Sequence, residues 1–186
     1  YRGRADAHGR LVDERGAATE YPVSPEQAAS ALAAKMVFTT GLITSDTLYV
    51  HQEGAVKTVV GYRKAQIIGL YMEGSETALR VPLPGLVLVR RTRGDSPDYT
   101  VFAVKRRPRS LTEPLYNAPL PNVFHSGGIC WGTVARPDTL APTDLSADFA
   151  QLLGSPFGSH AVGGKSKAHR GDVRKQLIAL NGRKRY

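Results

Sequence analysis

The chain has 186 residues, of which 41% are hydrophobic and 22% are charged, a composition that fits one folded domain and excludes an intrinsically disordered protein. No uninterrupted apolar run is long enough to span a bilayer, so a transmembrane protein is excluded and we expect a cytoplasmic one. The net charge of +9 gathers in basic clusters near residues 90–93, 105–109 and 165–185, but no RNA-recognition pattern accompanies them, which disfavours specific nucleic-acid binding.

The first segment with a clear local signal lies near residue 24. Residues 1–20 carry scattered charge and glycine without an apolar period, which predicts a loosely ordered amino-terminal arm. We expect the remainder, residues 21–186, to form a single domain. Ser24 is placed as a helix N-cap, Pro25 occupies the first helical position, and Gln27 is placed to close a capping box. These residues predict a helix that ends at about Lys35.

From residue 42 the pattern changes to short apolar runs that are separated by turn-forming residues. Val, Ile, Leu and Tyr dominate these runs, and glycine-containing turns connect several of them. The pattern predicts an antiparallel β-meander. The expected strands are residues 47–51, 55–62, 66–72, 86–91 and 99–105.

After the expected meander comes a stretch, residues 107–123, that contains four prolines and therefore predicts an ordered loop or flap. Helical spacing of apolar residues follows at 146–153 and again at 172–180, the second within a basic carboxy-terminal segment. Between them, the glycine, serine and lysine content of residues 158–171 indicates a mobile loop.

Cys130 is the single cysteine of the chain, so an intramolecular disulfide is excluded. The residue is buried filler, a surface accident or a reactive thiol. Its neighbours in the sequence favour the last interpretation. A cysteine thiol of ordinary pKa is partly ionised at neutral pH and is strongly nucleophilic.

The segment around Cys130 resembles a known signature. Pro121-Asn122-Val123-Phe124 followed by Gly128-Ile129-Cys130 resembles the active-site segment of ubiquitin-conjugating (UBC-fold) enzymes, and Cys130-Trp131-Gly132 is similar to the corresponding element of prokaryotic UBC family D, also called PRTRC system protein B. Further similarities are Glu113-Pro114-Leu115-Tyr116 and Phe157-Gly158-Ser159-His160. The resemblance covers roughly residues 42–162 and implies an α+β UBC-like fold, an antiparallel sheet with flanking helices, a proline-rich flap and a cysteine turn.

The resemblance also implies an activity and partners. Cys130 would carry a ubiquitin-like protein as a thioester received from an activating enzyme, and Asn122 would donate a hydrogen bond to the negative oxygen that develops during transfer. His160 would orient or deprotonate the attacking amine, or would have a structural role only. Leu120 departs from the histidine of the UBC-fold enzymes, as family D does. Implied gene neighbours include a JAB-type metallopeptidase, in bacteria and often on mobile elements.

Other residues are given weaker interpretations. His125 is interpreted as a loop residue, with a direct role beside Cys130 as the alternative. Trp131 is interpreted as core that packs against the flap, and Tyr116 as a packed aromatic side chain of the flap, with a contact to the bound tail as the alternative. His8, His51 and His169 are far apart and lack metal-ligand spacing, so we expect no metal and no other cofactor. Gly163-Gly164-Lys165-Ser166 matches only the end of a phosphate-binding loop. The alternatives to an enzyme are a catalytically silent UBC-like scaffold and, less favoured, a basic nucleic-acid-binding module.

Overall fold

The computed structural model describes residues 4–5, 11–12, 24–35, 40, 42–94, 96–136 and 143–186, and the chain divides into two units, residues 1–39 and 40–186. In the first unit, strand β1 (Arg4–Ala5) pairs antiparallel with β2 (Leu11–Val12). Most of the expected arm, including His8, lies outside the described residues. The expected domain boundary at residue 20 stays a prediction.

Helix α1 (Pro25–Lys35) begins where the capping residues place it. The Gln27 amide donates to Ser24 Oγ over 3.2 Å, and the Ser24 amide donates to Gln27 Oε1 over 3.1 Å. These reciprocal bonds satisfy amide groups that have no partner within the helix. The predicted capping box is confirmed.

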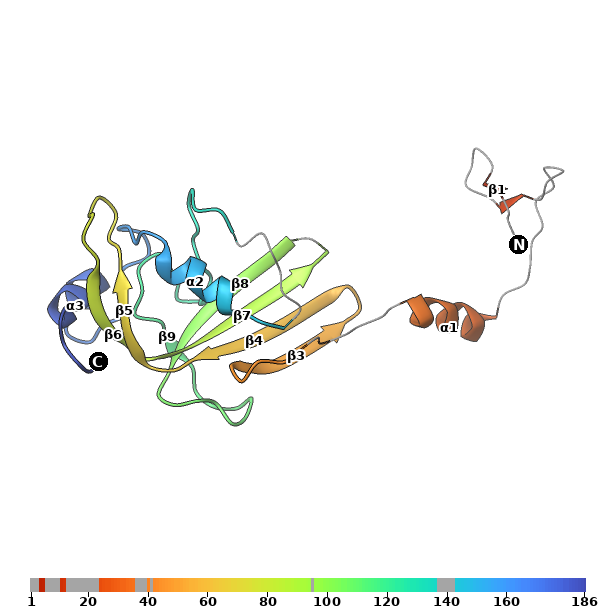
Figure 1. Ribbon diagram of the computed structural model, residues 1–186, viewed down its shortest axis with the longest axis horizontal. Coiled ribbons are helices and arrows are strands. Elements are labelled where there is room, and N and C mark those ends of the chain that lie inside the picture. Colours follow the sequence, from red (N-terminus) through yellow and green to blue (C-terminus); the bar gives the residue numbers. More distant parts are fainter. Residues whose placement is uncertain are drawn as a thin grey trace. The chain divides into compact units, whose positions relative to one another are not determined.

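The second unit is built on a five-stranded antiparallel sheet with the order β3-β4-β7-β8-β9 (Figure 1). Its strands are β3 (Thr47–Glu53), β4 (Val56–Arg63), β7 (Gly85–Arg93), β8 (Ser96–Val104) and β9 (Tyr116–Asn117).

Strands β5 (Gln66–Leu70) and β6 (Leu79–Leu83) leave this sheet and form a hairpin of their own. The predicted continuous meander is therefore wrong at this point, and β6 was missed. Pro82 lies inside β6, and proline argues against a strand unless the strand is at an edge. In a two-stranded hairpin every strand is at an edge, so the proline is accommodated.

Alternation along the strands gives the large sheet one face that is covered by a helix. Val59, Leu88 and Val101 are almost completely buried and pack with Phe149 and Leu152 of α2 (Ser146–Gly154). Helix α3 (Val173–Leu180) lies beside β6, with Leu177 fully buried in the same core (Figure 1). Both helices lie close to the predicted positions. The domain is thus α+β with a mostly antiparallel sheet and few helices, as predicted.

A buried ion pair joins α2 to the sheet. Asp148, in the first turn of α2, accepts a hydrogen bond of 2.9 Å from the Arg90 guanidinium and one of 2.7 Å from the Tyr99 hydroxyl. The side chains of Arg90 and Asp148 are 3% and 1% exposed. Burial and the adjacent carboxylate raise the pKa of Tyr99 well above its ordinary value, so its hydroxyl stays a donor. We refer to these three residues as the Asp148 cluster.

Within the described part of the chain, no helix has the length and apolar character that crossing a membrane requires.

Candidate functional site

Residues 122–130 form a tight hairpin, here called the cysteine hairpin, along the outer edge of β8. Val123 pairs with Ile129, and the Phe124 amide donates to the Gly128 carbonyl over 2.8 Å. The Val101 amide of β8 donates to the Gly127 carbonyl over 2.9 Å. The hairpin therefore continues the sheet edge that β9 occupies further along β8.

Gly127 is required at the turn of this hairpin. Its φ of +84° lies in the left-handed region, and a Cβ atom there would lie 2.4 Å from the Phe102 ring. Any side chain would collide with an aromatic ring of β8. Gly127 therefore has a packing role.

Cys130 closes the cysteine hairpin at its end. Its amide donates to the Asn122 carbonyl over 2.8 Å, and its side chain is half-buried. The next residue, Trp131, places its ring edge-on to Tyr99 with centroids 5.4 Å apart. Trp131 is partly buried against the hydrophobic core, as predicted, and its ring contacts Tyr99 of the Asp148 cluster.

Asn122 connects Cys130 to the segment that contains His160. Its backbone has a φ of +58°, a left-handed conformation that Asn tolerates better than most residues. The Asn122 amide donates to the His160 carbonyl over 2.8 Å, while its carbonyl accepts from Cys130. The Asn122 side-chain amide donates to the Pro156 carbonyl over 3.3 Å. The fold thus brings together, through their backbones, the three residues that the sequence nominated.

The two histidines near Cys130 differ in their contacts. The exposed ring of His160 packs edge-on against Phe124 of the cysteine hairpin, with centroids 5.3 Å apart. His125 Nδ1 accepts a hydrogen bond of 3.0 Å from the Asn117 side chain. Its ring also lies so close to Gly164 that a Cβ there would be 2.5 Å away. His125 therefore joins the hairpin to a neighbouring loop.

Lys165 is a site residue that sequence reasoning missed. It is 9% exposed, and its ammonium group donates to the carbonyls of Leu120 (2.7 Å), Ala161 (2.5 Å) and Val123. Burial lowers the pKa of Lys165 to about 8. The prediction of a mobile loop at 158–171 gave no indication that Lys165 is buried. The available signal was a lysine within a glycine-rich turn, which the sequence analysis weighed only as a partial phosphate-binding motif.

Glu73 is a second residue that the sequence did not nominate. A Cβ at Gly158 would lie 2.7 Å from Glu73 Oε2 and 3.6 Å from Asn122 Oδ1, so these two side chains flank the same glycine. The Glu73 amide also donates to the Phe157 carbonyl over 3.0 Å. Glu73 and Gly158 line a cavity of about 370 Å³, with Asp172 on its wall. The arrangement places an exposed carboxylate next to Asn122.

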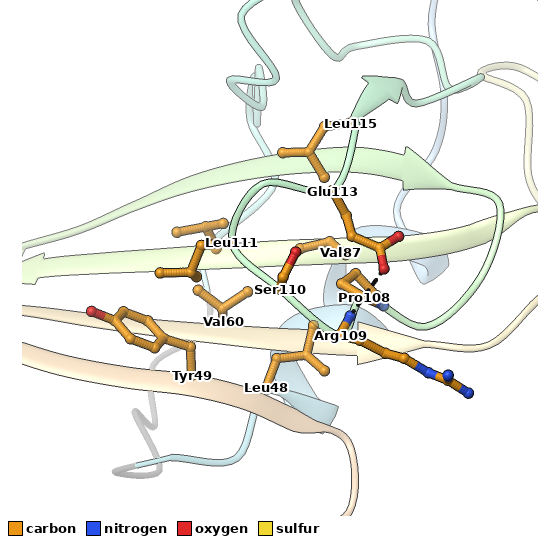
Figure 2. A pocket seen from close by; sticks show the side chains of 11 residues that line it. Leu48, Tyr49, Val60, Val87, Pro108, Arg109, Ser110, Leu111, Glu113 and Leu115 are labelled. Carbon is orange, nitrogen blue, oxygen red and sulfur yellow. Dashed lines mark hydrogen bonds between the residues drawn. The ribbon is translucent and has the colours of Figure 1, made fainter.

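Two further cavities lie away from Cys130. One of about 390 Å³ lies between the loop 108–115 and the face of the sheet that bears Val60 and Val87 (Figure 2). Another, of about 650 Å³, lies beside β9 and is lined in part by Lys105 and Lys167. Neither includes Cys130, Asn122 or His160.

A metal site does not emerge from the described residues, since none of their His, Cys, Asp and Glu side chains form a group of three or more that could hold an ion. His51 lies on β3 and His169 lies before α3.

Comparison with known proteins gives one match. The family model described as Prokaryotic E2 family D matches residues 26–186, which is most of the chain and extends beyond the region of motif resemblance on both sides. A search of the curated proteins and a search of the solved structures each found no match.

Proposed function

Because the chain belongs to prokaryotic E2 family D, we propose that it accepts a ubiquitin-like protein as a thioester on Cys130 and passes it to an amine. The family is the one that the motifs around Cys130 indicated. At family level it implies a ubiquitin-conjugating-like role, with a ubiquitin-like protein and an activating enzyme as general partners. The thioester, the donor and acceptor steps and the residues that carry them are our proposal.

The observation that carries the proposal is the backbone connection through Asn122. Its carbonyl accepts from the Cys130 amide, and its amide donates to the His160 carbonyl. One residue thus fixes the distance between a half-buried thiol and a segment with an exposed imidazole. Acyl transfer between two sulfurs is nearly balanced in free energy, so catalysis depends mainly on such positioning.

In the first step, the Cys130 thiolate attacks the thioester carbonyl carbon on the activating enzyme and expels that enzyme's thiolate. In the second, an amine attacks the new thioester and expels the Cys130 thiolate, while the amine gives up a proton. Asn122 Nδ2 carries two hydrogens, and one of them bonds the Pro156 carbonyl. The other is available for the oxyanion, a contribution worth about 3–4 kcal/mol in other acyl-transfer sites.

Two side chains near Asn122 could assist the attacking amine: His160 and Glu73. His160 is exposed beside Phe124, and a neutral imidazole nitrogen can accept a proton. Glu73 lies across Gly158 from Asn122 and would attract an ammonium group before it loses its proton. We assign the proton transfer to His160 and the attraction of the acceptor to Glu73.

The second candidate function is a catalytically silent scaffold. It is favoured by the contacts that Asn122 and His160 already make, since the Asn122 side chain bonds the Pro156 carbonyl and the His160 ring packs on Phe124. Under this alternative, Cys130 would serve packing alone.

The resemblance noted above suggests the wider system. We propose a bacterial PRTRC-type gene set on a mobile element, with a JAB-type metallopeptidase that removes the modifier. Copurification of this chain with the neighbouring gene products, compared with a Cys130→Ala variant, tests these partners.

The test of the proposal is a thioester assay with the activating enzyme and the ubiquitin-like protein encoded beside this chain, with ATP. We expect an adduct that a thiol reductant removes, and a reductant-resistant ester with Cys130→Ser, because an oxygen ester resists thiol exchange. Cys130→Ala is the matched control and should form no adduct. A wild-type protein that stays unmodified while the activating enzyme is charged would leave the scaffold alternative.

A further inference from the structure

Lys165 lies between the two segments that the proposed reaction depends on, residues 120–123 before Cys130 and residues 160–161. Leu120 and Val123, whose carbonyls it bonds, stand on either side of Pro121-Asn122, and the third carbonyl belongs to Ala161, directly after His160. In the described part of the chain no carboxylate forms a salt bridge with its ammonium group. All three of its donors are directed to backbone oxygens.

The same two segments contain two residues in an unfavourable backbone conformation. Asn122 and Ala161 have φ values of +58° and +51°, and they are the non-glycine residues with positive φ in the described part of the chain. Such conformations are unfavourable for residues other than glycine and persist only where the surroundings hold them. Lys165 bonds the carbonyl of Ala161 itself and that of Val123, which follows Asn122.

We propose that Lys165 is a positioning residue, whose ammonium group cross-links the segment before Cys130 to the segment after His160 and so sets Asn122 and His160 relative to the thiol. The role in catalysis rests on the proposed function. The cross-link supplies hydrogen bonds to the segment in which Leu120 stands in place of a histidine. It also accounts for the lysine in Gly164-Lys165-Ser166 without a phosphate, because the ammonium is buried and already satisfied.

The first test needs no partner. In Lys165→Met, amide hydrogen exchange at Asn122 and Cys130 should accelerate at least tenfold more than exchange at Leu88, which lies on β7 in the middle of the sheet. The matched control is Lys167→Met, an exposed lysine of the same loop, which should change none of these rates. Unchanged exchange at Asn122 and Cys130, or equal acceleration at all three, would overturn the proposal.

The wild-type protein provides a second measurement if the variant does not fold. Opening of the cross-link returns the Lys165 ammonium group to water, where its pKa lies near 10.5, so a higher pH favours the closed state. The ratio of intrinsic to observed exchange rate at Asn122 should therefore rise as pH passes about 8. Other titratable groups line the same region: Lys105, Lys167, Tyr116 and Tyr186 on the cavity wall, and His125 against Gly164. Lys167→Met and His125→Ala should leave the pH dependence in place; its loss in either variant, or a flat ratio in the wild type, refutes the assignment.

The catalytic role is tested by discharge of the wild-type and variant thioesters to free L-lysine. We expect Lys165→Met and Asn122→Ala each to slow discharge about 10- to 100-fold, and the double variant to be no slower than Asn122→Ala, since both changes act through one residue. In the variant, discharge should also lose the pH dependence near 8 that the wild type shows. Additive effects would contradict positioning. Absence of any wild-type thioester would remove the proposed function, while the exchange data would still decide whether Lys165 sets the site.

Discussion

Two buried polar clusters flank Cys130, and they satisfy a buried cation in different ways. The Asp148 cluster pairs Arg90 with a carboxylate and adds Tyr99, so charge is balanced within the core. Lys165 bonds three backbone carbonyls instead. The first arrangement joins a helix to the sheet, whereas the second joins two loops. The fold and the site therefore depend on separate buried cations, and each cation can be perturbed without the other.

The largest loss of stability is expected from Asp148→Ala. Removing one partner of the buried ion pair between Arg90 and Asp148 costs about 3–5 kcal/mol of unfolding free energy. Denaturant unfolding checks the value. The control is Glu113→Gln, which removes the partner of Arg106 at 3.4 Å, where the arginine side chain is 74% exposed, and should cost less than about 1 kcal/mol. Equal effects of the two substitutions would show that the Asp148 cluster does not stabilise the fold.

Lys165→Met should cost less, about 1–3 kcal/mol. Three carbonyls lose a donor, but a methionine side chain of similar length avoids the cost of burying an ammonium group. The same unfolding experiment measures it. A loss as large as that of Asp148→Ala would mean that Lys165 holds the whole fold and that the separation of roles is wrong.

The unfolding free energy of the wild type relative to Lys165→Met should depend on pH. The pKa of Lys165 is about 8 in the folded protein and lies near its ordinary value of 10.5 in the unfolded chain. Between these values the unfolded state binds more protons, so the unfolding free energy of the wild type should rise with pH relative to Lys165→Met. Below pH 8 both states are protonated and the difference should be constant. A difference that falls between pH 8 and 10.5 would contradict the lowered pKa.

The smallest effect is expected at His125. Its hydrogen bond to Asn117 is exposed, so His125→Ala should change the unfolding free energy by about 0.5–1.5 kcal/mol. Thioester formation on Cys130 should stay within twofold of the wild type, because the ring is directed to Asn117 and Gly164. A loss of thioester without a loss of stability would instead give His125 a chemical role.

Sequence reasoning predicted those features that local signals specify. The capping box of α1, the amphipathic spacing of α2 and α3 and most strands of the sheet were found because their patterns involve residues a few positions apart. Strand β6 was missed because Pro82 reads as a strand breaker, and its edge position depends on which strand pairs with it.

Only those site residues that a short sequence motif or the family resemblance identifies were predicted. Cys130 and Asn122 belong to one short motif, and His160 came from the resemblance. The contacts of Lys165 with Leu120 and Val123 join residues more than 40 positions apart, and no local sequence pattern predicts them. Arg90 and Asp148 are likewise 58 positions apart, so both buried clusters became apparent only from the fold.

The central claim is that Cys130 carries an acyl group delivered by another protein. Intact-mass measurement after incubation with the cognate activating enzyme, its ubiquitin-like protein and ATP tests it most directly. We expect a mass gain of one modifier less one water, located on the peptide that contains Cys130 and reversed by thiol reductant. A charged activating enzyme together with an unchanged mass for this chain would contradict the account.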